Sequence, residues 1–323
     1  MLINTGSPSA LTRRAVASYL RRFLSDRRII DIRAWQRFLL VNIGIVPLRQ
    51  FSTLRAYRRV WQSAAPLTQN MSDLHASLQA TLEPTFITAY ASRYSEPTIA
   101  QALDDLLRQD IAELMILPLF PQYSSAANGS AIEMSLKLLG QKKFIPQVRV
   151  VNHFYDEEFF LNPLTQSVAR ALDAMPQVDF LLFSYHGLPV RQLPCQLSND
   201  CCALASNRLC YRRQCLATSA TVAKRLRLAT DFWATSFQSR LGRIPWIKPY
   251  TDEFALQLLA RGVKHLAVVA PSFVADCLET VEEIGLRLKA DFIKRGGKSF
   301  TLIPALNSDP LWVQELSKFM QAR

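Results

Sequence analysis

Eight short runs of apolar or β-branched residues recur along the chain, and stretches with helical periodicity separate most of them. The runs are Leu2–Asn4, Phe86–Tyr90, Leu114–Leu117, Val148–Asn152, Phe180–Ser184, Phe232–Phe237, Leu266–Ala270 and Phe300–Pro304. Strands that alternate with helices form βαβ units, in which right-handed crossovers join parallel strands. The sequence therefore predicts an α/β fold with parallel sheets.

The two halves of the chain repeat three short motifs in the same order. The pairs are Gly6-Ser7-Pro8 with Gly187-Leu188-Pro189, Ser92-Arg93 with Ser239-Arg240, and Pro118-Leu119-Phe120 with Pro271-Ser272-Phe273. This repetition predicts two α/β domains of four strands each, with a ligand cleft between them. In this alignment Thr5 takes the place of His186, so only one half carries the imidazole.

The composition is that of a globular protein with a large core, because 49% of the 323 residues are hydrophobic and only 20% are charged. Met1 leads directly into the first predicted strand without the pattern of a secretory signal, so we expect a cytoplasmic protein. No stretch offers the roughly 20 apolar residues of a membrane-spanning helix.

The positive charge is concentrated near the start of the chain. Residues 1–65 contain twelve arginines and two aspartates, which accounts for ten of the net twelve positive charges. Between residues 9 and 24 an apolar face alternates at helical spacing with Arg13, Arg14, Arg21 and Arg22. Such a helix suits nucleic acid, an anionic membrane surface, acidic substrate groups or plain solvent. The apolar residues that follow favour peripheral contact with the inner face of the cytoplasmic membrane or acidic substrate groups over nucleic acid.

His186 is the histidine whose position most suggests a function. It follows an apolar strand and precedes Gly187 and Pro189, which build a tight turn at the sheet edge. The carboxyl ends of parallel strands are where α/β folds place their chemistry. We therefore predict that His186 belongs to a functional site.

A row of carboxylates follows the seventh apolar run in the same manner. If residues 276–285 are helical, Asp276, Glu279 and Glu283 lie three and four residues apart and share one face. The row is either a solvated helix face, or it holds a cation or a shared proton. Oxygen ligands suit a hard or borderline divalent ion. The position of the carboxylate row after a strand favours a bound cation or a shared proton over a solvated face.

Motifs along nearly the whole chain resemble those of the ferrochelatases, which insert Fe²⁺ into a porphyrin late in haem synthesis. They are Leu2–Pro8, residues 23–27, Pro118–Ser124 with Gly129-Ser130, the His186 motif, Phe237–Trp246, Pro249–Glu253 and Asp276–Glu283. The resemblance implies two Rossmann-like domains, at residues 1–153 and 154–305, and a C-terminal helix within 306–323 that returns to the first domain. It also implies protoporphyrin IX and ferrous iron as substrates.

The same resemblance assigns roles to individual residues. His186 and Glu279 match the catalytic pair, and these two with Asp276 and Glu283 would meet the metal. Four further positions would bind porphyrin: Arg49, Tyr57, Tyr123 and Thr5. A bidentate contact between an arginine and a propionate would explain the role of Arg49.

The chain departs from the family pattern at two places. Ser63-Ala64-Ala65-Pro66 stands where the family has Gly-Gly-Ser-Pro, and Ala91-Ser92-Arg93-Tyr94 where it has Gly-x-Arg-Tyr. Because alanine disfavours positive φ, we expect a different backbone path at the porphyrin lip.

Five of the six cysteines fall within one window of 21 residues: Cys195, Cys201, Cys202, Cys210 and Cys215. Disulfides are disfavoured in a cytoplasmic chain, so a bound metal or iron–sulfur group is the leading interpretation. The segment resembles an insertion that carries a [2Fe–2S] cluster in some bacterial ferrochelatases. A zinc site and free or paired thiols are the alternatives.

Two other classes of function compete with iron insertion into protoporphyrin IX. One is a non-catalytic protein that carries a tetrapyrrole or metal, or that senses redox state through the cysteines. The other is a chelatase that inserts cobalt or nickel. The proton acceptor His186 and its partner Glu279 argue against simple binding, and the sequence leaves the oligomeric state open.

Overall fold

The computed structural model describes residues 1–194, 208–240, 242 and 244–322. The chain divides into two compact units. Unit 1 comprises residues 1–120, 124–153 and 320–323, and unit 2 comprises residues 121–123 and 154–319.

Unit 1 contains a four-stranded parallel sheet in the order β2-β1-β3-β4. Its strands are β1 (Leu2–Asn4), β2 (Tyr90–Ser92), β3 (Glu113–Pro118) and β4 (Gln147–Val150). Its helical segments are α1 (Arg13–Leu24), α2 (Ala34–Leu39), η1 (Leu40–Ile45), α3 (Val46–Val60), α4 (Pro66–Thr81), α5 (Ile99–Leu107), η2 (Ser125–Gly129) and α6 (Ser130–Leu139). The segments η1 and η2 are π-helical.

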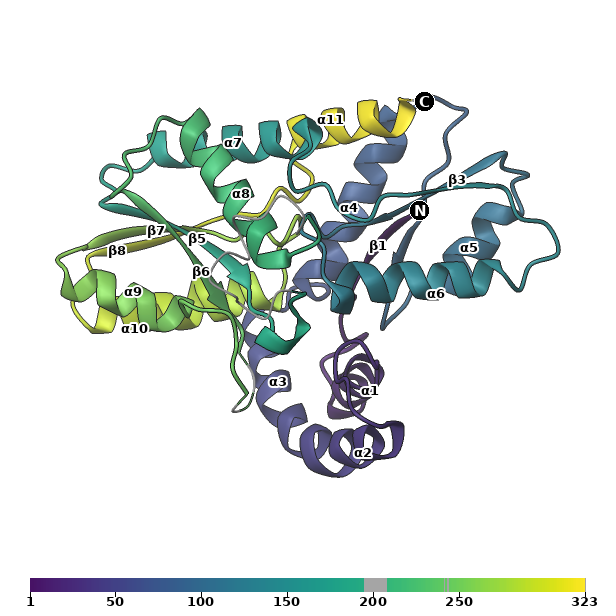
Figure 1. Cartoon of the computed structure of the whole chain (residues 1–323), viewed down its shortest axis with the longest axis horizontal. Coiled ribbons are helices and arrows are strands. Elements are labelled where there is room, and N and C mark those ends of the chain that lie inside the picture. Colours follow the sequence, from purple (N-terminus) through teal and green to yellow (C-terminus); the bar gives the residue numbers. More distant parts are fainter. Residues whose placement is uncertain (195–207, 241, 243, 323) are drawn as a thin grey trace. The chain divides into compact units, whose positions relative to one another are not determined.

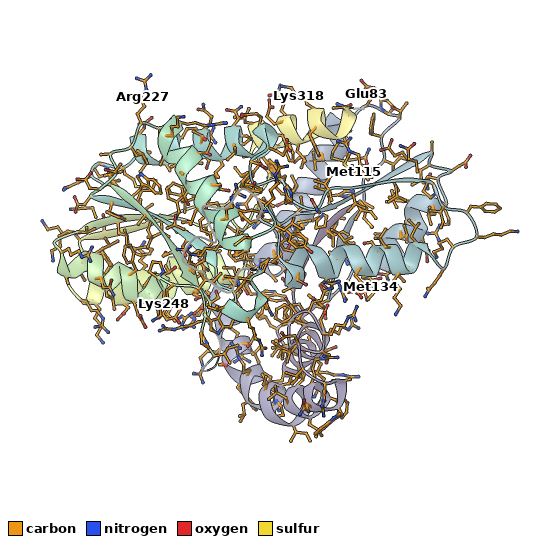
Figure 2. The ribbon with its side chains drawn as sticks, in the orientation of Figure 1. Glu83, Met115, Met134, Arg227, Lys248 and Lys318 are labelled. Atoms are coloured by element: carbon orange, nitrogen blue, oxygen red, sulfur yellow. The ribbon has the colours of Figure 1, made fainter. Side chains whose placement is uncertain are left out.

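The main core of unit 1 lies between its sheet and the helix pair α5 and α6, which pack on each other and on β2 and β3 (Figure 1). Helix α5 starts with a capping box, in which Thr98 and Gln101 each bind the other's backbone N–H. Its buried residues include Ile99 and Leu103, while Met134 of α6 packs against the same core (Figure 2).

Helices α1 to α3 form a separate lobe of unit 1 that projects away from its sheet (Figure 1). The lobe has a small core of its own, whose buried members include Val16, Leu20, Val41 and Leu54. The amphipathic helix predicted at residues 9–24 is observed as α1, and its four arginines at 13, 14, 21 and 22 are exposed.

Unit 2 repeats the arrangement of unit 1 with the parallel order β6-β5-β7-β8. Its strands are β5 (Phe180–His186), β6 (Trp233–Gln238), β7 (His265–Val269) and β8 (Ser299–Ile303). Its helical segments are α7 (Glu158–Asp173), η3 (Val190–Gln192), α8 (Tyr211–Arg225), α9 (Thr251–Ala260), η4 (Glu279–Leu288), α10 (Lys289–Lys294) and α11 (Pro310–Gln321). Here η3 is a 3₁₀ turn and η4 is π-helical.

The sheet of unit 2 is covered on both faces, by α7 and α8 on one side and by α9 and α10 on the other (Figure 1). Residues Phe180–Tyr185 of β5 are all buried. A parallel strand with both faces covered is apolar throughout, which explains the uninterrupted apolar run in the sequence. The predicted α/β fold with two four-stranded parallel sheets is confirmed.

Helix α11 packs largely within unit 2, where Trp312 stacks on Phe154 and Phe159. Of the segment 306–323, residues 306–319 lie in unit 2 and residues 320–323 in unit 1. Within the part of the chain that the structure describes, none of the helices has the length and apolar character needed to cross a bilayer.

The second strand begins later than the sequence suggested, at Tyr90 instead of Phe86. Thr88 instead donates through its backbone N–H and its hydroxyl to the side chain of Gln79 on α4. The alanines at the expected lip need no positive φ, because Ala65 is the N-cap of α4 with φ −63° and Ala91 is a buried strand residue.

Candidate active site

His186 is the last residue of β5, and three hydrogen bonds fix it there. Its backbone N–H donates to Ser272 Oγ at 3.0 Å, and its carbonyl accepts from the hydroxyl of Tyr211 at 2.8 Å. Its ring Nδ1 lies 2.7 Å from the carbonyl oxygen of Gly187. A carbonyl only accepts, so Nδ1 carries the proton and Nε2 keeps a lone pair in the neutral ring.

Glu279 and Glu283 approach this imidazole from η4, the π-helical segment that follows β7 and its loop. π-helical turns are rare in proteins as a whole, but those that occur are often found at functional sites. Gln238, which pairs with His186 across the sheet, donates to the backbone carbonyl of Glu279 at 3.1 Å. The next residue, Ser239, binds the carboxylate of Glu283 with its N–H at 3.0 Å and its hydroxyl at 2.6 Å.

The environment of Glu283 favours its protonated form. Burial is the main cause of the raised pKa of Glu283, because its side chain is only 22% exposed and the charged form loses solvation. The hydrogen bond from Ser239 and the charges of Arg287 and His186 act to lower that pKa, whereas the charge of Glu279 raises it. Glu283 therefore interacts electrostatically with both His186 and Glu279.

Asp276 is occupied by structural hydrogen bonds. Its Oδ1 accepts from the hydroxyl of Thr280 at 2.8 Å, and its Oδ2 accepts from Asn307 at 2.9 Å and from the N–H of Ala305 at 3.2 Å. Asp276 thus ties the start of η4 to the loop after β8. Its neighbour Cys277 is buried, and burial raises the pKa of that thiol.

The described residues contain no group of three or more His, Cys, Asp and Glu side chains arranged to hold a metal ion. The four predicted metal-binding residues, His186, Glu279, Asp276 and Glu283, are therefore not assembled as a closed coordination shell. A base and two acids at one sheet edge can exchange protons and attract a cation.

The family model named Ferrochelatase matches residues 1–323 of the chain. The chain belongs to the ferrochelatase family. It is 41% identical to "Ferrochelatase" of Legionella pneumophila (strain Philadelphia 1) over 328 residues, which covers 99% of this chain and 97% of the relative. It is also 39% identical to "Ferrochelatase" of Coxiella burnetii (strain Dugway 5J108-111), covering 98% and 91%.

A solved structure described as "SirB from Bacillus subtilis with Fe3+" has a similar fold. The TM-score is 0.54 at 9% sequence identity, and the match covers 78% of this chain and 88% of that one. Identity this low supports the fold alone. The resemblance stated from the motifs is thus confirmed at the level of the ferrochelatase family.

The predicted porphyrin-binding residues are divided between the units. Thr5 follows β1, Arg49 is exposed on α3, and Tyr57 lies two turns further along α3 with only 4% of its surface exposed. Tyr123 belongs to unit 2, where its N–H donates to Gln214 on α8. Their roles toward a porphyrin stay predictions.

The cysteine group predicted for a ferrochelatase of the cluster type lies mostly outside the described residues, which omit Cys195, Cys201 and Cys202. Cys210 and Cys215 are buried at the start of α8. Burial raises the pKa of the Cys215 thiol well above its usual value.

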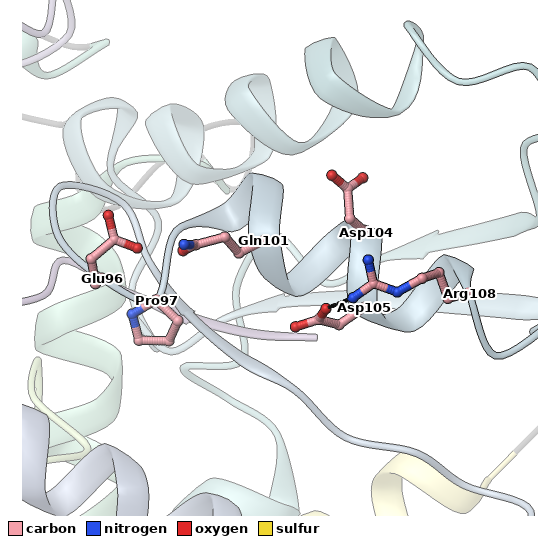
Figure 3. A pocket seen from close by; sticks show the side chains of 6 residues that line it. All are labelled: Glu96, Pro97, Gln101, Asp104, Asp105 and Arg108. Atoms are coloured by element: carbon pink, nitrogen blue, oxygen red, sulfur yellow. Dashed lines mark hydrogen bonds and ion pairs between the residues drawn. The ribbon is translucent and has the colours of Figure 1, made fainter.

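The lining of a shallow depression of about 800 Å³ on unit 1 includes none of the predicted site residues. It is formed by α5 and the turn before it, with Asp104, Asp105 and Glu96 on its rim (Figure 3). Figure 3 shows Arg108 paired with Asp105. Its charges are therefore partly compensated and it offers no groups for the chemistry of the family.

The sequence did not single out Gln238 and Ser239, although both lie in the Phe-Gln-Ser-Arg motif and Ser239 in an internal repeat. Ser272 and Tyr211 were also missed. Their functional contacts join segments 25 to 86 residues apart. The signals that could have found them are the family motif, the internal repeat, which also contains Ser272, and their positions at or near the ends of strands and helices.

Proposed function

We propose that this chain inserts Fe²⁺ into protoporphyrin IX to form protohaem, the terminal step of haem synthesis, with His186 and Glu279 as its catalytic pair. The observation that carries the proposal is the position of His186 at the end of β5, where its Nδ1 is bound to the carbonyl of Gly187 and the charge of Glu283 acts on it. A passive carrier would not require a fixed proton acceptor.

The reaction replaces two pyrrole N–H protons by one Fe²⁺ ion, so the macrocycle loses two protons while its net charge is unchanged. His186 accepts a pyrrole proton at Nε2, because Nδ1 is already protonated and bound to Gly187. The resulting imidazolium is stabilised by the neighbouring carboxylates. The positive charge also disfavours iron at the same position, which helps to order the two steps.

Glu279 and Glu283 supply negative charge where a dication must lose its water shell. Glu283, with its raised pKa, can carry a proton away or release one when the cation arrives. Asp276 contributes less to metal contact, because hydrogen bonds to Thr280, Ala305 and Asn307 occupy its oxygens.

The porphyrin would be held by residues that match the family's pocket. The exposed guanidinium of Arg49 suits a bidentate contact with a propionate, while Thr5 and Tyr123 would lie against the macrocycle. Tyr57 is buried, with its ring 6.0 Å from that of Trp61 at the end of the same helix, so it would meet the macrocycle only at the edge of its side chain.

The decisive experiment is an anaerobic insertion assay that follows the Soret band of protoporphyrin IX with Fe²⁺. We expect turnover by the wild type, none by His186→Ala with porphyrin binding retained, and a severe loss in Glu279→Gln. Binding without turnover in the wild type would support a carrier. Turnover only with Co²⁺ or Ni²⁺ would support another chelatase, and wild-type rates in either variant would refute the residue roles.

We further propose a [2Fe–2S] cluster whose ligands are Cys195, Cys201, Cys202 and Cys210, with Cys215 as a core residue. Cys210 is the N-cap of α8 and stands nearer in the sequence than Cys215 to the other three cysteines. Cys215 lies one turn further inside, where burial raises its pKa and favours the thiol. When bound, such a cluster would supply a one-electron couple; no step of the insertion depends on it.

The cluster is tested by the visible spectrum and by iron, sulfide and zinc analysis of protein purified without oxygen. Cys210→Ser should abolish the iron–sulfur bands, and the matched variant Cys215→Ser should keep them. Zinc found without sulfide would indicate a zinc site in place of the cluster. Loss of the iron–sulfur bands in Cys215→Ser would refute the proposed set of ligands.

We also propose that the lobe of α1 to α3 binds an anionic membrane surface peripherally. Residues 32–72 contain six arginines and neither aspartate nor glutamate. Trp35, Phe38 and Ile43 are 60%, 63% and 70% exposed on this lobe. Exposed apolar side chains beside an excess of positive charge are typical of a segment that lies in the lipid interface.

Co-sedimentation with vesicles of phosphatidylglycerol, compared with phosphatidylcholine, tests this contact. We expect binding to the anionic vesicles that weakens with salt and falls in a Trp35→Ser/Phe38→Ser variant. Phe144→Ser is the matched control, because Phe144 is 78% exposed elsewhere in unit 1. Equal binding by all three proteins, or no salt dependence, would contradict the proposal.

A further inference from the structure

Ser239 has an unusual backbone conformation next to the catalytic histidine. It follows β6 directly, one residue after Gln238, which pairs with His186. Its φ is +67°, in the left-handed region that non-glycine residues rarely adopt. Glycine would take this conformation with less strain, but it would lack a hydroxyl.

This conformation directs two donors of one residue at one carboxylate. The N–H of Ser239 reaches Glu283 Oε1 at 3.0 Å, and its hydroxyl reaches Oε2 at 2.6 Å. Because each oxygen is held, the carboxylate plane cannot rotate. Each oxygen also keeps a lone pair for a proton or a cation.

Arg287 competes with Ser239 for the carboxylate of Glu283. The guanidinium of Arg287, one helical turn along η4 and 62% exposed, lies 3.7 Å from Glu283 Oε1. That distance is too long for a hydrogen bond. It is short enough for the carboxylate to rotate toward the guanidinium when the hydrogen bonds from Ser239 are lost. Glu283 would then form a surface ion pair and leave the vicinity of His186.

We propose that Ser239 is a positioning residue that holds the carboxylate of Glu283 toward His186 and the incoming Fe²⁺, against the pull of Arg287. The inference rests on the proposed iron insertion. It predicts that Ser239 affects the kinetics of the reaction with Fe²⁺ and does not affect porphyrin binding.

The first test compares Ser239→Ala and Ser239→Gly in the anaerobic insertion assay, with Fe²⁺ and porphyrin varied separately. Both variants lose the hydroxyl, and only the glycine variant relieves the backbone strain. We expect kcat/KM for Fe²⁺ to fall about ten-fold in both, as for the loss of one charge-assisted hydrogen bond, with KM for porphyrin unchanged. Ser299→Ala is the control, because Ser299 bonds His265 at the far end of the sheet.

The second test is a double-mutant cycle with Glu283→Gln. If Ser239 acts through Glu283, Ser239→Ala/Glu283→Gln should be no slower than Glu283→Gln alone. A further ten-fold loss in the double variant would overturn the inference, as would wild-type kinetics in Ser239→Ala or full activity in Ser239→Gly. A wild type that inserts no iron would instead refute the proposed function, on which the inference rests.

Discussion

Gly187→Ala tests whether the turn after β5 depends on close packing of the backbone. Gly187 has an ordinary φ, yet a Cβ added to it would lie 2.7 Å from the carbonyl oxygen of Gln238 and 3.4 Å from the ring of Trp246. The N–H of Gly187 donates to that same carbonyl at 2.7 Å. An added methyl group therefore has to separate the ends of β5 and β6.

The cost can be worked out from two contributions. Overpacking of a tight site costs about 1–3 kcal/mol, and the lost backbone hydrogen bond adds about 1 kcal/mol. The sum of about 2–4 kcal/mol corresponds to a decrease in Tm on the order of 3–6 °C for a chain of 323 residues. Because the carbonyl of Gly187 also orients the ring of His186, we expect kcat to fall ten- to a hundred-fold, as for a displacement of about 1 Å.

Calorimetry and the insertion assay measure both effects. Gly140→Ala is the matched control, because Gly140 has φ −64° at the C-cap of α6 and its added Cβ would be no closer than 3.4 Å to any atom. That variant should be as stable as the wild type or slightly more so. If Gly187→Ala has the same Tm as the control variant and the kcat of the wild type, the close approach of the two strand ends does not fix the position of His186.

Three further predictions concern groups outside the site. Asp26→Ala removes a carboxylate that accepts from an arginine, a tyrosine and a serine, so urea unfolding should show a loss of about 3–5 kcal/mol. Burial acts to raise the pKa of Asp179, but two backbone N–H donors outweigh it and lower that pKa. Asp179→Ala should therefore cost about 1 kcal/mol at pH 7, and the difference from wild type should vanish as the pH falls below about 4. Cys215 and Cys277 are buried and have raised pKa values, so both thiols should resist alkylation until the protein unfolds. Peptide mass spectrometry after alkylation of the native protein measures this, and labelled Cys215 or Cys277 would contradict the prediction.

The architecture could be predicted from the sequence because buried parallel strands are apolar on both faces. All eight predicted runs overlap a strand, but β2 shares only Tyr90 with its run, and β4 ends two residues before its run does. The strand-end position of His186 also followed from the sequence, because an apolar run leads directly into it. The approach of Glu279 and Glu283 to that edge follows from the topology of the same sheet.

The side-chain contacts of the site could not be predicted, because they depend on partners distant in the chain. Spacing placed Asp276 in the acidic row, but its Oδ2 is bound by a loop 29 and 31 residues away. Likewise, helical periodicity does not reveal that Tyr57 is buried or that Ser239 adopts a positive φ. Both properties arise from packing between elements.

The internal repeat explains why only one half of this scaffold carries the proposed chemistry. In both units a glycine follows the first strand because the chain there passes close to the end of its neighbour: Cβ atoms would clash with Ser92 and Ser95 at Gly6 and with Gln238 at Gly187. In both units a π-helical segment follows the third strand, η2 after β3 and η4 after β7. The backbone is thus duplicated down to an uncommon helix type. The residue before the glycine is threonine in unit 1 and His186 in unit 2, and η2 contains no acidic residue where η4 carries Glu279 and Glu283. A shared backbone therefore sets where a base and its acids can meet, and unit 2 alone carries the proposed base and acids at that place.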